Sequence, residues 1–506
     1  MDLLRGIFRR PRVSDGPPLF RRPRLNDDLH FWFTIVARRL RFRPPVNLRK
    51  ALNVVLALVA ATAVVLALRP TGLEQEIIYM AGIFVLAALL WVTEALPLFA
   101  TALLVMGLEI LLLANPGGWD GLGFANGASP DYRVFLDPLS DPIIVLFLGG
   151  FLMARAAIKE GVDVALAGVI LRVFGGRPLA VMLGLMLITA FFSMFMSNTA
   201  TTAMMITLVV PMLAQLPHQD PIRKGLVLSV PFAANLGGMG TPISSPPNAV
   251  AVAFLQQAGF EVSFLDWMLI AVPLALLLLA VTWGLLAVLF RPVTRGAQLR
   301  PQAQRIEPRG WYVIIVIVAT IALWLTDRLH GLPTAVVALL PTVAFTATGL
   351  LGRRDFNRLE WHILILIAGG IALGVGMQQT GLDQVMVGLI PVEGAWLLVA
   401  LVAATIVFST FMSNTAAANL LLPIGISIAL VAEANGGPSA QQLTLCIALA
   451  ASTAMALPIS TPPNAIAYAH GELETRDLAL AGSLVSVLAA VLILAFGLPI
   501  IAFWTG

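Results

Sequence analysis

The chain has 506 residues, of which 59% are apolar and 11% are charged, and its mean hydropathy is +0.91. Soluble domains are roughly 45–50% apolar and about 25% charged, so a chain of this length could not bury so much apolar surface in water. The composition predicts a polytopic membrane protein and excludes a nucleic-acid binder, a disulfide scaffold and a disordered chain. The single cysteine, Cys446, excludes an internal disulfide and a cysteine-based metal site.

The first 50 residues are basic and hold 13 of the 31 Lys and Arg residues. An apolar piece at 31–36 is too short to span a bilayer and lacks a small-residue cleavage site, so it is not a typical signal peptide. We expect a cytoplasmic segment. It is either an interfacial helix on anionic lipid or a simple positive-inside anchor.

Eleven stretches downstream are apolar enough to cross a hydrocarbon core, which takes about 20 residues of helix. They are 51–68, 76–93, 97–114, 141–158, 225–257 (interrupted), 265–290, 311–326, 332–351, 361–377, 441–470 (interrupted) and 478–504. Two further apolar blocks, 181–215 and 395–432, are each split by Ser-Asn-Thr into arms of roughly 14–18 residues, which are short for a span. We expect re-entrant hairpins, whose polar tips must be buried in protein or face water.

The positive charges support this topology. With the N-terminus inside, 28 of the 31 Lys and Arg residues lie in inside segments, and only Arg69, Arg133 and Arg328 lie outside. A missed helix would scramble that alternation. The sequence therefore predicts eleven spans, with the N-terminus in the cytoplasm and the C-terminus outside.

Two pairs of motifs reveal an internal repeat. Residues 192–200 (FSMFMSNTA) match 408–416 (FSTFMSNTA), and 242–249 (PISSPPNA) match 458–465 (PISTPPNA), both at an offset of 216. Upstream, paired glycines match at an offset of 220. Each half has five spans and one hairpin, and five is odd, so the halves enter from opposite sides. Inverted repeats with broken helices are typical of secondary transporters, whose site lies near the midplane.

The motifs offer the chemistry of an ion site. At each tip, hydroxyl and amide oxygens suit Na⁺, while N–H and O–H donors suit a carboxylate or sulfate. Pro246-Pro247 and Pro462-Pro463 lack N–H groups and leave upstream carbonyls free for a cation. The half-helices that follow present their positive ends to an anion. One such motif is more often helix packing or a kink, but two symmetric copies favour a binding site.

Charged residues are absent from the motifs themselves. Every Lys and Arg falls in a loop or at a span end, so we expect no basic side chain near the substrate. A dianion there would need co-bound cations, which predicts coupling to Na⁺ or another cation. No Asp, Glu or His lies within the motifs, which argues against a proton relay. The sequence also shows no cluster of His, Cys or carboxylate residues of the kind that an enzyme would need, and we expect no organic cofactor.

The paired tips, each followed by a Pro-Pro-Asn break, resemble the divalent anion/sodium symporter family, which includes bacterial sodium–dicarboxylate cotransporters and mammalian citrate, dicarboxylate and sulfate carriers. The resemblance covers 51–506. It implies an all-α homodimer of eleven spans in the cytoplasmic (inner) membrane, working as an elevator. The implied parts are a basic segment (1–50), scaffold (51–177 and 311–390), transport part (178–290 and 391–506) and cytoplasmic linker (291–310).

The family's functional residues carry over onto matching positions. One sodium site would use Ser193, Ser197, Asn198 and Ser244, and a second Ser409, Ser413, Asn414 and Ser460. The substrate would meet Asn198, Thr199, Ser245, Asn414, Thr415, Thr461 and Pro462. The helix breaks would rest on Pro246, Pro247, Asn248, Pro463 and Asn464. The family often has Gly where this chain has Ser244, which leaves the identity of the anion open.

The function that we expect is therefore Na⁺-coupled transport of a C4-dicarboxylate such as succinate, malate or fumarate, with two or more Na⁺ per cycle. A sodium-independent dicarboxylate exchanger, or a citrate or sulfate carrier, fits the same motifs. A non-transporting sensor or a membrane enzyme is a more distant alternative.

Overall fold

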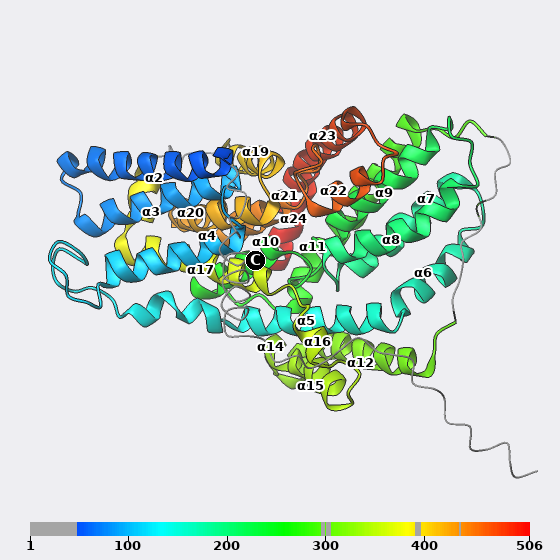
Figure 1. Ribbon diagram of the computed structural model, residues 1–506, viewed down its shortest axis with the longest axis horizontal. Helices are drawn as coiled ribbons and strands as arrows, with labels where there is room; N and C mark the ends of the chain where they lie inside the picture. The colour runs from blue at the N-terminus through cyan, green and yellow to red at the C-terminus, as the bar shows by residue number, and fades with distance from the viewer. Residues whose placement is uncertain (1–47, 295–298, 300–304, 390–395, 435–436, 506) are drawn as a thin grey trace, which may run out of the picture. The chain divides into compact units, whose positions relative to one another are not determined.

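The computed structural model of the chain describes residues 48–294, 299, 305–389, 396–434 and 437–505. These residues form helices and turns without a strand (Figure 1). Eight of the described helices are long and apolar enough to cross a membrane. The predicted all-α membrane fold is confirmed, whereas the predicted interfacial helix near the N-terminus lies outside the described residues.

The helices of the first half run in the order that the sequence predicts. They are α2 (Leu48–Leu68), α3 (Gln75–Thr93), α4 (Leu98–Glu109), α5 (Pro142–Lys159), α6 (Val162–Val173), α7 (Pro178–Ser193), α8 (Asn198–Leu213), α9 (Ile222–Gly237), α10 (Pro246–Gln257) and α11 (Phe264–Leu289). Short turns of 3-10 helix lie at Arg69–Thr71, Tyr132–Phe135 and Asp137–Ser140, and a π-helical turn at Ile110–Ala114 continues α4.

The second half repeats the pattern with more short helices. They are α12 (Pro308–Leu325), α13 (Asp327–His330), α14 (Thr334–Val337), α15 (Leu339–Ala347), α16 (Arg353–Phe356), α17 (Trp361–Thr380), α18 (Leu382–Gly388), α19 (Trp396–Phe411), α20 (Asn414–Ala434), α21 (Ala440–Ala451), α22 (Pro462–Ala469), α23 (Thr475–Leu492) and α24 (Leu498–Thr505). A π-helical turn at Ile493–Gly497 joins the last two.

Seven of the eight long helices coincide with predicted spans, and the eighth, α20, lies in a predicted hairpin. This arm has 21 residues and is longer than predicted. The other four predicted spans consist of shorter helices: α4 with its π turn, α14 with α15, and the two interrupted spans as α9–α10 and α21–α22. The interruptions fall at the Pro-Pro motifs because each Pro-Pro occupies the first turn of a new helix, where a missing N–H costs no hydrogen bond.

The two repeats interlock at their broken helices. Within each repeat the hairpin packs on the first half of the broken helix, α7 and α8 on α9, and α19 and α20 on α21. The second halves cross over, so that α10 packs on α20 and α21, while α22 packs on α8 and α9. Small residues permit the close approach of α7 and α9, since a Cβ on Gly237 would lie 2.4 Å from Ala190. Each repeat therefore completes the helical core of the other.

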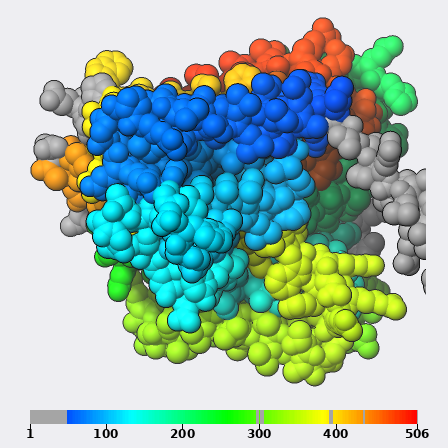
Figure 2. Space-filling model, turned by 60° about the vertical axis from the view of Figure 1, so that its left-hand side comes forward, coloured from blue at the N-terminus to red at the C-terminus, as the bar shows by residue number. Residues whose placement is uncertain are grey.

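Helices α2 and α3 lie side by side, as the space-filling view shows in blue (Figure 2). Ala57 and Ala61 of α2 pack on Leu86 and Leu90 of α3, while a Cβ on Gly82 would lie 2.6 Å from Val65. Many other apolar side chains of α2 are exposed, such as Val55, Val59 and Leu66. Such a surface is expected of a helix that faces lipid, whose tails are as apolar as the side chains.

Candidate functional site

The tip of the first hairpin is a four-residue turn between α7 and α8. Ser197 caps α8 by accepting a hydrogen bond from the Ala200 N–H at 3.3 Å. This is the usual role of serine at the start of a helix. Ser193, the last residue of α7, places its Oγ 2.6 Å from Asn198 Oδ1 and 2.7 Å from the carbonyl oxygen of Ala234 on α9. The Asn198 amide lies against Gly238, where a Cβ would come within 2.4 Å of it.

The tip of the second hairpin repeats this geometry. Ser413 caps α20 by accepting from the Ala416 N–H at 3.2 Å. Ser409 Oγ lies 2.7 Å from Asn414 Oδ1 and 2.7 Å from the carbonyl oxygen of Ala451. The structure therefore brings together Ser193 with Asn198, and Ser409 with Asn414, as the family resemblance implies.

Each tip holds more acceptor oxygens than hydrogens. A serine hydroxyl carries one hydrogen, yet Ser193 and Ser409 each face an amide oxygen and a backbone carbonyl. The serine hydrogen can serve only one of these two acceptors at a time, and at the first tip the Ala234 carbonyl also accepts from the Gly238 N–H at 2.8 Å. Three close oxygens of this kind form an electronegative centre, and neutral oxygens are ligands that suit a hard cation such as Na⁺. The donor set at both tips thus fits the cation that the sequence predicts as cargo.

The asparagines of the Pro-Pro-Asn motifs close the breaks between helices. The Asn248 amide donates to the carbonyls of Gly238 and Thr241, at 2.9 and 2.8 Å. Asn464 donates to those of Met455 and Leu457, at 2.9 and 3.1 Å. Both side chains are buried. These four carbonyls belong to the segments whose freed carbonyls were predicted to bind a cation, and each uses one lone pair to accept from an asparagine.

Different hydroxyls tie the two breaks to their tips. In the first repeat, Thr241 donates to the Met194 carbonyl, whereas Ser244 donates within its own loop, to Gly238 at 2.6 Å or Thr241 at 2.7 Å. In the second repeat, Ser460 donates to the Thr410 carbonyl at 2.6 Å. The side chain of Ser244 therefore donates hydrogen bonds within its own loop, whereas that of Ser460 links the second helix break to the second hairpin.

One hydrogen bond joins the two repeats at their breaks. Asn235, near the end of α9, donates to Thr461 Oγ1 at 3.1 Å, and Thr461 also caps α22. Both residues are buried. Asn235 Oδ1 has no hydrogen-bond partner among the described residues. Thr461, which the resemblance assigns to the substrate, is thus held by the opposite repeat.

The remaining substrate candidates form no such contacts. Thr199 and Thr415 are half-buried and follow the tip asparagines, and their hydroxyls have no hydrogen bond to other described residues. Ser245 is buried and Pro462 is exposed, each at the end of a break. Since α22 packs on α8 and α10 packs on α20, each break begins its second helix beside the other repeat's hairpin.

A cavity of about 190 Å³ adjoins the first tip. Ser197 and Ala200 line it on one side, and Arg155, Arg358 and Glu360 on another. Ser197 Oγ donates to Glu360 Oε1 at 3.3 Å. The sequence predicted no basic side chain near the site, and for the space beside this tip that is wrong: Arg155, in the last turns of α5, and Arg358, in the loop before α17, both line it.

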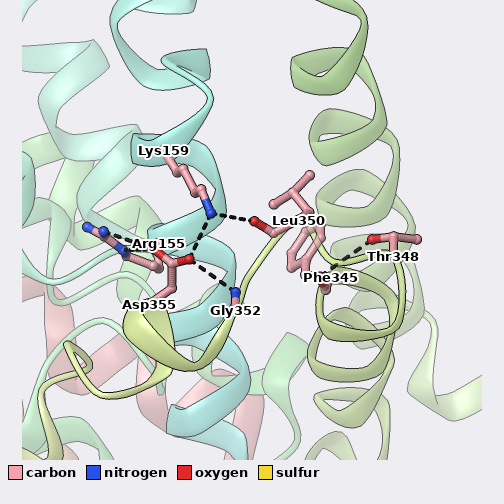
Figure 3. Close-up of polar contacts among 7 residues, drawn as sticks. All are labelled: Arg155, Lys159, Phe345, Thr348, Leu350, Gly352 and Asp355. Atoms are coloured by element: carbon pink, nitrogen blue, oxygen red, sulfur yellow. Dashed lines mark hydrogen bonds and ion pairs between the residues drawn. The ribbon is translucent and has the colours of Figure 1, made fainter.

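Ion pairs fix the surroundings of that cavity (Figure 3). Asp355 on α16 accepts from Arg155 at 3.0 Å and from Lys159 at 2.7 Å, while Lys159 also donates to the Leu350 carbonyl. The hydrogen bond from Lys159, with those from Gly352 and Arg155, lowers the pKa of the Asp355 carboxyl to about 2. Asp355 thus stays ionised and neutralises much of the charge of Arg155. Arg358 is exposed and has no ion pair among the described residues.

No sequence motif marked Asn235, Arg358 or Glu360 as residues of the site. Asn235 could have been found, because it is a lone amide in an otherwise apolar stretch of α9. Nothing in the sequence marks Arg358 and Glu360, since they belong to a short charged loop like any other connection between spans. Glu360 is 163 residues from Ser197 along the chain, so their contact depends on tertiary packing and not on a local pattern.

The chain is similar to known transporters. The family described as "Sodium:sulfate symporter transmembrane region" matches residues 48–505. A sodium-dependent dicarboxylate transporter, SdcS, of Staphylococcus saprophyticus is 29% identical over 90% of this chain and 92% of its own length. An uncharacterized transporter of Schizosaccharomyces pombe is 30% identical over 83% of this chain, which spans about half (49%) of that relative's length.

A solved structure shares the fold. The crystal structure of the Alcanivorax borkumensis YdaH transporter, described as having an unusual topology, aligns with a TM-score of 0.54. The alignment covers 82% of this chain and 98% of that one, at 14% sequence identity.

Proposed function

The chain belongs to the sodium:sulfate symporter family, and on that premise we propose that it carries a C4-dicarboxylate such as succinate, malate or fumarate across the inner membrane, driven by Na⁺. It is an integral membrane transporter and not an enzyme. The dicarboxylate relative in Staphylococcus saprophyticus supports this choice of substrate.

The observation that carries the proposal is the pair of matching hairpin tips. Ser193 with Asn198 and Ser409 with Asn414 each gather three oxygens around one hydroxyl hydrogen. We assign one Na⁺ to each tip, with Ser197 and Ser413 as further ligands and the loops at Ser244 and Ser460 closing the two sites. Two cations would offset the charge of a dianion, which a low-dielectric site otherwise disfavours.

The anion would lie between the tips. The amides of Asn198 and Asn414 and the free hydroxyls of Thr199 and Thr415 would donate to its two carboxylates, together with Ser245, Thr461 and the start of α22 at Pro462. Pro246, Pro247, Asn248, Pro463 and Asn464 would act indirectly, by holding the breaks in shape.

Movement would follow the elevator scheme. The transport part, 178–290 with 391–506, would slide against the scaffold, 51–177 with 311–390, in a homodimer whose N-terminus is cytoplasmic and whose C-terminus is outside. The ion pair of Arg328 on α13 with Asp266 on α11, at 2.5 Å, joins the two proposed parts and would open during that movement.

Uptake of labelled succinate by proteoliposomes, with and without an inward Na⁺ gradient, tests this proposal. Sodium-dependent accumulation supports it. Uptake only by vesicles preloaded with dicarboxylate would instead identify an exchanger. If succinate is not taken up but sulfate or citrate is, the dicarboxylate assignment is wrong; sulfate is the anion named by the family description.

A further inference from the structure

The first hairpin tip has a carboxylate neighbour that belongs to the other proposed part of the protein. Glu360 immediately precedes α17, and its Oε1 accepts a hydrogen bond from Ser197 Oγ at 3.3 Å. Ser197 is at once the cap of α8 and a proposed Na⁺ ligand. The contact therefore joins the scaffold to the group that would hold the cation.

Open space lies beside this contact. The cavity of about 190 Å³ is bounded by Ser197 and Glu360, so that a hydrated ion can approach both. Two arginines share the cavity, but Arg155 is paired with Asp355. Arg358 and Glu360 have no ion-pair partner among the described residues, so the cavity holds one group suited to a cation and one suited to an anion.

The hydrogen bond to Glu360 alters what Ser197 can do. Because the hydroxyl hydrogen points to a carboxylate, the bond is charge-assisted and increases the electron density on Oγ. A more negative Oγ is a stronger ligand for a cation. The carboxylate also attracts Na⁺ directly and repels an anion that arrives before Na⁺ does.

The second repeat lacks this arrangement. At the offset of 220 that relates the scaffold halves, Ser140 takes the place of Glu360. The Ser140 hydroxyl donates to the backbone carbonyl of Asp137 in its own turn. Within the described ranges, Ser413 accepts from the Ala416 N–H and has no carboxylate partner. The two tips are alike in their own residues but differ in what the scaffold presents to them.

We propose that Glu360 is a positioning residue of the first cation site: it polarises Ser197 and draws Na⁺ from the adjoining cavity, so that this tip binds Na⁺ more tightly than the second and before the anion. The inference rests on the proposed Na⁺ coupling and adds a scaffold residue that helps to determine sodium affinity in one conformation.

Binding of radiolabelled Na⁺ to the purified full-length protein, at constant ionic strength kept with choline, tests this inference without any anion. In Glu360→Gln we expect the half-saturating Na⁺ concentration of the tighter site to rise about 3–10-fold, from the loss of one charge-assisted hydrogen bond and one nearby charge. Glu360→Asp keeps the charge and should give a smaller rise. Glu307→Gln is the matched control, since Glu307 is exposed and likewise precedes the first turn of a scaffold helix, α12.

Transport in proteoliposomes separates the possible roles. We expect Glu360→Gln to raise the Na⁺ requirement while the KM for the anion at saturating Na⁺ changes less than twofold. Unchanged Na⁺ binding in a folded Glu360→Gln protein would overturn the inference, and so would an equal rise in anion KM, which indicates a simple mechanical contact. If Glu360→Gln does not fold, Na⁺ binding of Glu360→Asp equal to that of the wild type overturns it. If the wild-type protein itself shows no sodium dependence, the proposed function fails, whatever the variants do.

Discussion

Asn198 and Asn414 occupy the same place in the two hairpins, and each is fixed on one side by a serine and open on the other. Their side chains are half-buried, so part of each amide remains free for a ligand. Because Asn198 also lies against Gly238, its side chain is held in place before any ion arrives. A preorganised ligand of this kind loses little conformational entropy on binding.

Replacing either asparagine by alanine should abolish sodium-dependent uptake, because the change removes a cation ligand and an anion donor together. Uptake of labelled substrate by proteoliposomes measures this, with size-exclusion chromatography to check folding. Asn126→Ala, in an exposed loop, is the control and should transport as the wild type does. Wild-type uptake by Asn198→Ala or Asn414→Ala would exclude the assigned site.

Thr199 supports a finer prediction. Its hydroxyl makes no hydrogen bond to another described residue, so Thr199→Val should leave the fold intact and remove only a contact with the anion. We expect the apparent affinity for the anion to fall roughly 10-fold, the equivalent of about 1–2 kcal/mol. Thr207→Val is the control, since the Thr207 hydroxyl already donates to Met204 on the same helix. An unchanged KM in Thr199→Val would place this hydroxyl outside the substrate site.

At the scale of elements, the short helix α16 is tied to α5 by charge. Asp355 receives hydrogen bonds from Arg155 and Lys159, and the Gly352 N–H donates to its second oxygen at 3.1 Å. The same turn leads into Arg358 and Glu360, which line the cavity at the first tip. The ion cluster thus positions the loop that contacts the hairpin.

The lowered pKa of Asp355 predicts how this junction responds to acid. The carboxyl ionises with a pKa of about 2 in the folded protein and about 4 in an unfolded chain. Its contribution to stability is therefore full above about pH 4 and is lost as the pH falls from about 4 to 2. Asp355→Asn should cost about 1–3 kcal/mol near neutral pH. Thermal unfolding in detergent should show the Tm difference from the wild type narrowing below pH 4, and a constant difference down to pH 3 would contradict this assignment.

At the scale of the whole molecule, the crossing of α10 and α22 makes the two repeats one structural unit. Packing of α22 on α8 and α9, and of α10 on α20 and α21, buries helices of one repeat against the other. The hydrogen bond from Asn235 to Thr461 closes this junction. Neither repeat has a complete core without its partner.

Dividing the chain tests this interdependence. Cutting within the linker, between Gln302 and Ala303, separates the repeats and leaves every helix of the described residues whole. The two pieces produced together should associate and transport, because the contacts between repeats do not need a covalent link. Each piece alone should be degraded or aggregate. Co-purification of the pieces and substrate uptake measure the outcome, and a stable, folded first piece on its own would contradict the interlock.

Sequence patterns predicted the helices, the repeat and the helix breaks. Each of these can be read from a local stretch of sequence: an apolar run, a duplicated motif or a pair of prolines. The resemblance to the symporter family also implied that Ser193 would lie with Asn198 in one site. Sequence patterns could not predict which carbonyls Asn248 and Asn464 would occupy, nor the contact of Glu360 with Ser197. Those depend on how helices distant in sequence pack, and α20 was likewise longer than its polar tip suggested.

The crossing helices α10 and α22 also have a consequence for how the protein folds during its synthesis. Asn235 and Thr461 are 226 residues apart. A ribosome adding about 5–20 residues per second needs roughly 11–45 s to make the intervening chain. Throughout that time no α22 is present to cover α8 and α9, and the Asn235 amide lacks the Thr461 hydroxyl as its acceptor. The nascent first half must therefore be sheltered, by lipid, water or a chaperone, until the last tenth of the chain emerges.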